Sequence, residues 1–197
     1  MSDFLGLILL AYLLGSIPFG LVVSRALGGP DPRGRGSGNL GTANLYRLLG
    51  LKAGALTFLG DTLKGTLPVL VAGGWLPAGP WREAMVAVVG GVAVLGHVFP
   101  LYLKFRGGKG VATAFGVVAA LAPEAAAILV LVYILVMART RIFSLSALVC
   151  AWMLPLAVGL FSGAKAYLLL AGFLSLLILA CHRENLERLF KGEEPRI

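Results

Sequence analysis

Glycine and hydrogen-bonding side chains are concentrated between residues 36 and 47, whose sequence is GSGNLGTANLYR. Gly36, Gly38 and Gly41 match the G-x-G-x-x-G pattern of dinucleotide-binding loops, but that loop requires a preceding buried strand within a βαβ unit. Here an apolar run and an arginine-containing linker precede the glycines instead. We therefore interpret the segment as a glycine-rich loop whose N–H groups and polar side chains bind an anion.

Arg47, at the end of this segment, carries a planar guanidinium that can bind phosphate through two parallel hydrogen bonds. The other candidate groups of the segment are Gly36, Ser37, Gly38, Asn39, Gly41, Thr42 and Asn44. The alternative interpretation is a flexible linker, which would not need so many side-chain donors beside an apolar segment.

A second polar segment begins at His97, near the end of an apolar run, and continues to the sequence FRGGKG at residues 105–110. It is not a Walker A loop, because that motif requires Ser or Thr after the lysine, where this chain has Gly110. The motif also requires a glycine at the position that Leu103 occupies. Gly107, Gly108 and Lys109 before a new apolar run predict an anion site made by backbone donors, a helix N-terminus and an ammonium group. An ordinary basic loop would explain the charges but not the glycines. His97 alone is more typical of a structural histidine at a helix end.

The third polar segment, HRENLER at residues 182–188, follows the last apolar run. In a continuous helix, His182 and Asn185 share one face, while Glu184 and Arg188 can pair on another. A solvated amphipathic tail accounts for Glu187, Arg188 and Lys191. It does not account for a His–Asn pair at a membrane boundary, because polar groups near a membrane interior are costly and are by default functional candidates.

Several chemistries lack their sequence signals. The chain has only two His and no H-E-x-x-H pattern or Cys/His cluster, so no catalytic metal is expected. No G-x-S-x-G nucleophile elbow occurs, and neither histidine is followed by the Asp of an H-x-x-x-x-D acyltransferase pattern. The three segments therefore predict a glycine-rich, cationic pocket for a substrate with phosphate at one end and lipid at the other.

The composition places these groups in a polytopic membrane protein. Of the 197 residues, 58% are hydrophobic and 13% are charged, whereas soluble domains are about 25% charged. The net charge of +8 is dispersed between apolar runs rather than gathered in one block, so we expect no nucleic-acid partner. Apolar runs, each compared with the ~20 residues that span a bilayer, cover residues 4–24, 53–75, 84–103, 110–121, 125–138, 142–164 and 166–181. The run 53–75 contains Asp61 and Lys64, which as ionisable groups inside a span are functional candidates.

The distribution of basic residues orients these seven predicted segments. If Pro123 and Glu124 form a turn, 14 of the 17 Lys and Arg residues fall on one side of the membrane, and only Arg82 and Lys165 on the other. The positive-inside rule then predicts an external N-terminus and a cytoplasmic C-terminus. Residues 110–121 and 125–138 either cross fully or form a re-entrant pair. The fold class that follows is all-α, in one membrane-embedded domain over residues 1–197.

The three motifs together resemble those of the bacterial acyl-phosphate:glycerol-3-phosphate acyltransferases, the PlsY family. The resemblance covers essentially the whole chain, with the motifs at residues 36–47, 97–113 and 182–185 in the same order. It implies a seven-helix protein of the bacterial cytoplasmic (inner) membrane, with its active site facing the cytoplasm. It further implies transfer of a fatty acyl group from acyl phosphate to the 1-hydroxyl of glycerol 3-phosphate, giving lysophosphatidic acid and phosphate in the first acylation of phospholipid synthesis.

This resemblance assigns roles to the candidate residues. The catalytic set is Ser37, Asn39, Arg47, Lys109, His182 and Asn185, and the substrate-binding set is Gly36, Gly38, Gly41, Thr42, Asn44, His97, Gly107, Gly108 and Gly110. The proton acceptor is either His182 or an oxygen of the acyl phosphate. We expect membrane lipid around a monomer, and neither metal nor cofactor. The competing hypothesis is a transporter for a phosphorylated metabolite, but transporters show inverted repeats with matching broken helices, and no repeat is visible here.

Overall fold

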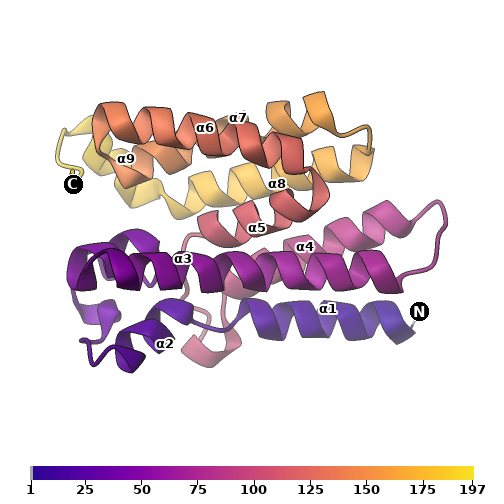
Figure 1. The fold of residues 1–197 in the computed structure, drawn as a ribbon, viewed down its shortest axis with the longest axis horizontal. Coiled ribbons are helices and arrows are strands. Elements are labelled where there is room, and N and C mark those ends of the chain that lie inside the picture. Colours follow the sequence, from indigo (N-terminus) through magenta and orange to yellow (C-terminus); the bar gives the residue numbers. More distant parts are fainter. Residues whose placement is uncertain (1) are drawn as a thin grey trace. The chain divides into compact units, whose positions relative to one another are not determined.

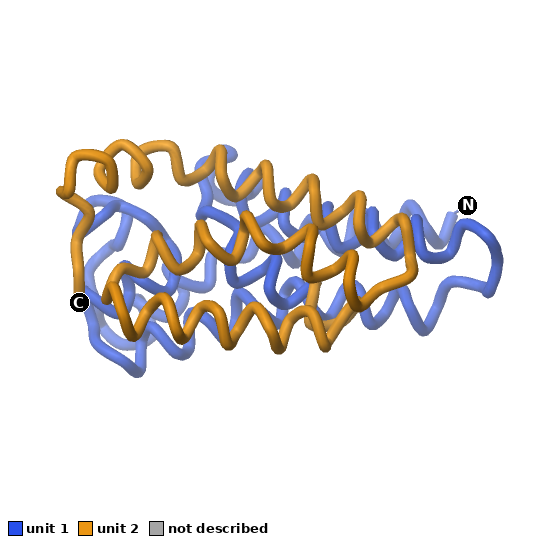
Figure 2. The backbone as a smooth tube through the Cα atoms, turned by 90° about the horizontal axis from the view of Figure 1, so that it is seen from above, with its two compact units in different colours: residues 1–117 blue, residues 118–197 orange. Residues whose placement is uncertain are grey.

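The structure, a computed structural model, describes residues 2–197, and within this range every regular element is a helix (Figure 1). The all-α class predicted from the composition is therefore confirmed. The sequence predicted a single domain over the chain. Contacts divide the chain into two compact units, residues 1–117 and residues 118–197, which meet within one helix (Figure 2). We describe each unit by itself.

The first unit contains two long helices, two shorter ones and two turns of 3₁₀ helix. Its elements are α1 (Ser2–Gly15), α2 (Phe19–Ala26), η1 (Pro32–Gly34), α3 (Thr42–Trp75), α4 (Arg82–Val98), η2 (Leu101–Leu103) and the beginning of α5 (Val111–Leu121). The run 4–24, predicted as one helix, bends by 43° between α1 and α2. The bend coincides with Pro18, which lacks the N–H that a continuous helix would use and crowds the preceding turn.

Helix α3 is longer than the predicted run 53–75, because it begins at Thr42 inside the glycine-rich segment. Gly50 interrupts it with φ +79° and ψ −170°, a conformation open to glycine and strained for other residues. A short helical segment before Gly50 therefore carries Asn44 and Arg47, and a longer apolar segment follows. The polar segment 36–47 is half loop and half helix.

Glycines allow close backbone contacts between helices of the first unit. A Cβ built on Gly15 of α1 would collide with the Ala93 carbonyl of α4, and one on Gly96 of α4 would collide with the backbone of α1. The same holds between α3 and α5, where Gly116 faces the Thr62 carbonyl. Small residues at helix crossings are the usual means of close packing in membranes.

The second unit is built from the end of α5 and four further helices. These are α6 (Pro123–Thr140), α7 (Phe143–Phe161), α8 (Lys165–Cys181) and α9 (Arg183–Phe190). The predicted division of this run is confirmed, but it lies at Ala122, and Pro123 and Glu124 form the first turn of α6 instead of the turn between the helices. Consecutive helices α6, α7 and α8 pack against each other, and the chain turns by 60° at His182 between α8 and α9.

Four spans among the described residues are long and apolar enough to cross a membrane: α3, α4 continued through η2 to Leu103, α6 and α7. The number rises to six if the bent pairs α1–α2 and α8–α9 each count as one span. The predicted seventh span would be α5, but its 11 residues extend about 16 Å at 1.5 Å per residue. This is about half of the ~30 Å hydrocarbon core, so the count of seven and the orientation remain predictions.

Candidate active site

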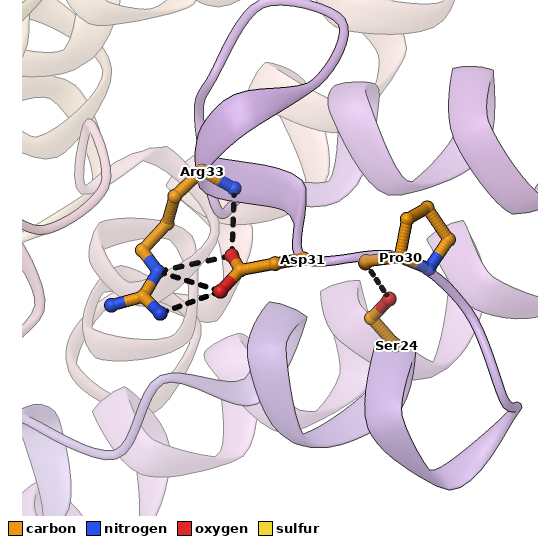
Figure 3. Close-up of polar contacts among 4 residues, drawn as sticks. All are labelled: Ser24, Pro30, Asp31 and Arg33. Carbon is orange, nitrogen blue, oxygen red and sulfur yellow. Dashed lines mark hydrogen bonds and ion pairs between the residues drawn. The ribbon is translucent and has the colours of Figure 1, made fainter.

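The loop between α2 and α3 is held in shape by its own polar contacts (Figure 3). The Ser24 hydroxyl donates to the Pro30 carbonyl at 2.6 Å, which fastens the loop to the end of α2. Asp31 caps η1 by accepting from the Arg33 backbone N–H at 3.0 Å, and pairs with the Arg33 guanidinium at 2.5 Å. Hydrogen bonds from Arg33 lower the pKa of Asp31 to about 2, so this exposed pair keeps its charges across the physiological pH range.

Asn44 organises the glycine-rich part of the same loop from within. Its side chain is 1% exposed, and its Oδ1 accepts a hydrogen bond from the Ser37 backbone N–H at 3.0 Å. Its Nδ2 lies near three backbone carbonyls, those of Pro32 (3.2 Å), Arg35 (3.1 Å) and Asn39 (2.8 Å). Asn44 therefore joins the start of α3 to four points of the loop.

The backbone N–H groups of the loop are mostly engaged inside the protein. Ser37 donates to Asn44, Gly38 donates to the Arg35 carbonyl at 3.0 Å, and Gly41 donates to Asn39 Oδ1 at 2.7 Å. The expectation that the N–H groups of these three residues lie free to bind an anion is therefore wrong.

The side chains of the glycine-rich segment differ in how far they reach solvent. Ser37 is exposed, whereas Asn39, Thr42 and Arg47 are half-buried and Gly41 caps α3. Gly36 and Gly38 have φ of +59° and +70°, values that glycine adopts readily. A Cβ on Gly36 would collide with the Asn44 amide. The glycines thus shape the loop, and the side chains of Ser37 and Arg47 are its candidates for contact with an anion.

Gly107 and Gly108 lie directly against the end of α4. Their N–H groups donate to the carbonyls of Val98 (3.0 Å) and His97 (3.1 Å). A Cβ on Gly107 would collide with those carbonyls, and a Cβ on Gly108 would collide with Nε2 of the His97 ring. The expectation that these two residues offer backbone donors to a phosphate is therefore wrong. Their lack of side chains instead lets the loop lie on His97.

Lys109 follows this close contact and is half-buried. Gly110, with φ +83°, precedes α5, and its carbonyl accepts the Ala114 N–H at 2.8 Å. Lys109 therefore stands two residues before α5, between two glycines whose backbone paths are fixed. Within the first unit, the loop that carries Lys109 packs against the end of α4.

Three ionisable side chains, Asp61 and Lys64 of α3 and His97 of α4, form a buried cluster in the same unit. None of them is more than 6% exposed. Lys64 Nζ lies 2.8 Å from Asp61 Oδ1, and His97 Nδ1 lies 3.5 Å from the same oxygen. Lys64 Nζ also donates to the Ile17 carbonyl at 2.7 Å, in the break between α1 and α2.

This cluster connects the broken first span, α3 and α4 to the loop that carries Lys109. His97, predicted to bind substrate, points its Nδ1 toward Asp61 and has its Nε2 beneath Gly108. Sequence reasoning noted Asp61 and Lys64 as unusual charges in a span but did not link them to His97. The i, i+3 spacing of Asp61 and Lys64 was a usable signal for their ion pair, whereas the contact with His97 depends on the packing of α4.

In the second unit, His182 lies at the turn between α8 and α9 and is 4% exposed. Its Nδ1 is 2.8 Å from the Ile178 carbonyl. Because a carbonyl can only accept a hydrogen bond, Nδ1 carries a proton, and Nε2 is the acceptor nitrogen whenever the ring is neutral. The local backbone thus fixes the orientation and the tautomer of His182.

Asn185, one turn further on, donates through Nδ2 to Glu194 Oε1 at 2.5 Å. Glu194 is buried at 8% exposure and also accepts from the Ser144 hydroxyl (2.7 Å) and from Arg188 Nε (2.7 Å). Burial raises the pKa of Glu194, but these hydrogen bonds outweigh it and the pKa falls below its ordinary value. The carboxylate is thereby held in its charged form.

Sequence reasoning missed Glu194 altogether. Arg188, expected to pair with Glu184 or to be solvated, pairs with Glu194 instead, so that expectation is wrong. The sequence signal for this ion pair was weak, because a Glu six residues after an Arg in a charged tail is usually exposed to solvent. Only the return of the tail to α7 and α9 buries it.

A sequence model of glycerol-3-phosphate acyltransferases matches residues 5–192. The chain belongs to this family. A glycerol-3-phosphate acyltransferase of Syntrophotalea carbinolica is 41% identical over 100% of this chain and 98% of the relative. One of Pseudomonas syringae pv. tomato is 47% identical over 93% of each chain.

Two solved structures show the same fold. They are crystal structures of PlsY, an integral membrane glycerol 3-phosphate acyltransferase, in a glycerol 3-phosphate form and a lysophosphatidic acid form. The TM-scores are 0.91 and 0.90 at 38% identity, over 99% of this chain and 96% and 95% of those chains. The predicted membership of the PlsY family is confirmed. The chain is all-helical among its described residues and belongs to a family of integral membrane acyltransferases.

Proposed function

We propose that this PlsY-family protein transfers a fatty acyl group from acyl phosphate to the 1-hydroxyl of glycerol 3-phosphate, giving lysophosphatidic acid and inorganic phosphate. The observation that carries the proposal is the similarity over almost the whole chain to a PlsY captured with glycerol 3-phosphate and with lysophosphatidic acid. These are the acceptor before acylation and the product after it. The reaction would be the first acylation of phospholipid synthesis, at the cytoplasmic face of the bacterial inner membrane.

The choice of acyl phosphate as donor rests on the sequence resemblance and on the chemistry of the side chains. Acyl phosphate is a mixed anhydride, and its phosphate is a good leaving group. The substrate hydroxyl itself attacks the carbonyl carbon, so no protein nucleophile is needed. The new C–O ester bond forms as the bond to phosphate breaks, and the hydroxyl proton passes to a phosphate oxygen or to His182. The protein has to position the reactants and stabilise charge.

Each unit contributes groups suited to part of this task. In the first unit, we assign phosphate binding to Arg47 and Lys109, because guanidinium and ammonium groups bind phosphate as cations. Ser37 adds an exposed hydroxyl to polar recognition, and Asn39 adds its half-buried side-chain amide. The two loops that carry these groups are supported by the remaining candidate residues, which are Gly36, Gly38, Gly41, Asn44, Gly107, Gly108, Gly110 and His97. Thr42 begins α3. In the second unit, we assign His182 and Asn185 to orienting the reacting hydroxyl.

The experiment that tests the function measures phosphate release by the purified protein in detergent or liposomes. Release should require acyl phosphate and glycerol 3-phosphate together, with lysophosphatidic acid formed in equal amount. An acyl thioester in place of acyl phosphate should give no product. Equal rates with the thioester would contradict the assignment of the donor.

The same preparation in sealed liposomes addresses the competing transporter hypothesis. Glycerol 3-phosphate should be consumed only when acyl phosphate is present. Uptake of unaltered glycerol 3-phosphate without acyl phosphate would favour transport.

A further inference from the structure

The segment after α9 folds back so that its only buried residue, Glu194, meets α7 and α9. Glu194 accepts from Ser144 at the start of α7, and from Asn185 and Arg188 of α9. Two backbone hydrogen bonds hold the same segment: Glu193 N–H donates to the Arg188 carbonyl at 2.8 Å, and Ile197 N–H donates to the Arg141 carbonyl at 2.9 Å. The carboxylate is therefore fixed both by its own contacts and by the path of the chain.

A buried carboxylate decides how the amide beside it must lie. The ionised Glu194 has only acceptor oxygens, so the Asn185 NH₂ group has to face it. A 180° turn of the amide would place Asn185 Oδ1 against Glu194 Oε1, two acceptors at hydrogen-bond distance, and leave a buried charge poorly satisfied. Glu194 thus selects one of the two orientations that are open to an asparagine side chain.

The negative charge also limits what Asn185 can bind. Glu194 Oε1 is 2.5 Å from Asn185 Nδ2, so an anion taking the second N–H of that nitrogen would lie within a few ångströms of a carboxylate. Like charges this close in a buried place repel strongly. A neutral hydroxyl that donates to Asn185 Oδ1 meets no such repulsion.

We propose that Glu194 is a positioning residue that fixes the Asn185 amide so that its carbonyl oxygen accepts a hydrogen bond from a hydroxyl of the acceptor substrate. The proposal rests on the proposed function and goes beyond it, because it assigns a role to the tail and names the atom of Asn185 that acts. Asn185 then aligns the hydroxyl, and does not bind a phosphate.

The first test compares two neighbouring glutamates that lose the same charge. Glu194→Gln replaces an accepting oxygen by an NH₂ group that opposes Arg188 and frees the Asn185 amide to turn. We expect kcat/KM for glycerol 3-phosphate to fall about 10- to 100-fold, in the range for a lost charged hydrogen bond. KM for acyl phosphate should stay unchanged. Glu193→Gln, at an exposed position, should match the wild type, and equal behaviour of both variants would overturn the proposal.

The second test exchanges the two side chains' hydrogen-bonding roles. Asn185→Asp alone puts two carboxylates together, and kcat/KM for glycerol 3-phosphate should fall more than about 100-fold. Asn185→Asp combined with Glu194→Gln keeps the net charge, lets the new amide donate to the new carboxylate, and retains an accepting oxygen at position 185. Activity should recover to within about tenfold of the wild type. A folded double variant no more active than Asn185→Asp would show that an N–H of Asn185 is needed and overturn the proposal.

A milder variant covers the case in which Glu194→Gln does not fold. Ser144→Ala removes one donor to Glu194, and Ser146→Ala is its control, because Ser146 is also buried on α7 but donates to the Ile142 carbonyl. We expect about a threefold fall in kcat/KM for glycerol 3-phosphate with Ser144→Ala only, in line with one weakened hydrogen bond. Equal effects of the two variants would count against the proposal.

Two reference measurements separate this inference from the proposed function. If wild-type protein releases no phosphate from acyl phosphate when glycerol 3-phosphate is added, the proposed function fails and the inference with it. If the wild type is active and Asn185→Ala is equally active, the function stands and the inference is overturned.

Discussion

Two buried asparagines, Asn44 and Asn185, differ in the kind of group that their side chains contact. Asn44 makes all of the contacts described for it with loop backbone, through both ends of its amide. Asn185 meets a carboxylate through Nδ2, and that contact specifies the amide's orientation. From sequence, both were candidates for contact with substrate. The contacts of Asn44 give it a structural role in the loop, whereas we propose that Asn185 orients the acceptor hydroxyl.

Replacement of Asn44 should therefore disrupt the loop rather than remove a single substrate contact. Asn44→Asp retains an acceptor for the Ser37 N–H but sets a carboxylate oxygen against three carbonyls, so it should be at least as harmful as Asn44→Ala. Each should destabilise the protein by about 1–3 kcal/mol, the usual cost of buried groups left unsatisfied. Thermal unfolding and KM for both substrates measure this. A normal unfolding temperature with a raised KM for one substrate only would indicate direct binding instead.

His182 tests whether the protein or the substrate accepts the proton. His182→Asn can still donate to the Ile178 carbonyl, because an asparagine amide reaches about as far as Nδ1, whereas His182→Ala cannot. If the acyl phosphate takes the proton, His182→Asn should retain clearly more kcat than His182→Ala, and the pH profile of kcat should keep its shape. A positioned general base contributes about 10²–10⁴-fold. Equal losses of that size in both variants, with an acid limb present in the wild type only, would identify His182 as the base.

At the scale of elements, the loop at residues 104–110 is defined by the helix beneath it. Its two central glycines are required by the His97 ring and by the last carbonyls of α4. The buried partners Asp61 and Lys64 in turn hold His97. Removing one member of a buried charged group typically costs about 3–5 kcal/mol. Asp61, Lys64 and His97 therefore help to determine where Lys109 lies.

A double-mutant cycle can separate the two glycines. Gly108→Ala alone should cost about 1–3 kcal/mol of stability, as overpacking commonly does. In a His97→Ala background its cost should become smaller, because the ring that the new methyl group meets is gone. Gly107→Ala should cost the same in either background, since its Cβ meets backbone carbonyls. Thermal unfolding of the variants measures both couplings, and equal coupling for both glycines would contradict this packing.

The tail offers a prediction about stability and pH. The pKa of folded Glu194 lies below its ordinary value of 4.5, so the unfolded chain takes up the proton first as pH falls. Glu194 therefore stabilises the fold fully above about pH 4.5, and this contribution is lost as pH falls through the folded pKa. The difference in unfolding temperature between wild type and Glu194→Gln should be largest near neutral pH and vanish in acid. A difference independent of pH would show that packing alone accounts for it.

Sequence patterns predicted the helical class, the break near Pro123, the three polar segments and the family. They succeeded because apolar run length and motif order are local properties of the chain. They wrongly predicted that the N–H groups of Gly107 and Gly108 are free to bind an anion. These N–H groups donate to carbonyls at the end of α4, and only the packing of the loop on α4 brings the two together. They failed on Glu194 for the same reason, since its partners belong to α7 and α9. The bend at Pro18 could have been predicted, because proline interrupts a helix. The prediction of one continuous helix considered only the length of the uncharged run.

At the scale of the whole molecule, the open question of topology reduces to whether α5 and α6 contribute an odd or an even number of crossings. Helix α6 is long enough to cross, and α5 is about half the necessary length. Two crossings and a re-entrant pair both return the chain to the side where α5 began. A single crossing by α6 would place every later segment on the opposite side. The positive-inside distribution favours an even number, because it gathers 14 of 17 basic residues on one side.

Single cysteines at Gly34, Gly79 and Gly163 can decide this in intact cells, in a chain whose native Cys150 and Cys181 are replaced by alanine. All three glycines are exposed, and an added side chain would meet nothing within 4 Å. We expect a membrane-impermeant thiol reagent to label the cysteines at 79 and 163 from outside, and the cysteine at 34 only after permeabilisation. Helix α3 separates the first two positions once, and an even number of crossings separates 79 from 163. Labelling of 34 and 163 together, apart from 79, would show that α5 and α6 provide one crossing. Labelling of 34 alone in intact cells would mean that the predicted orientation is inverted.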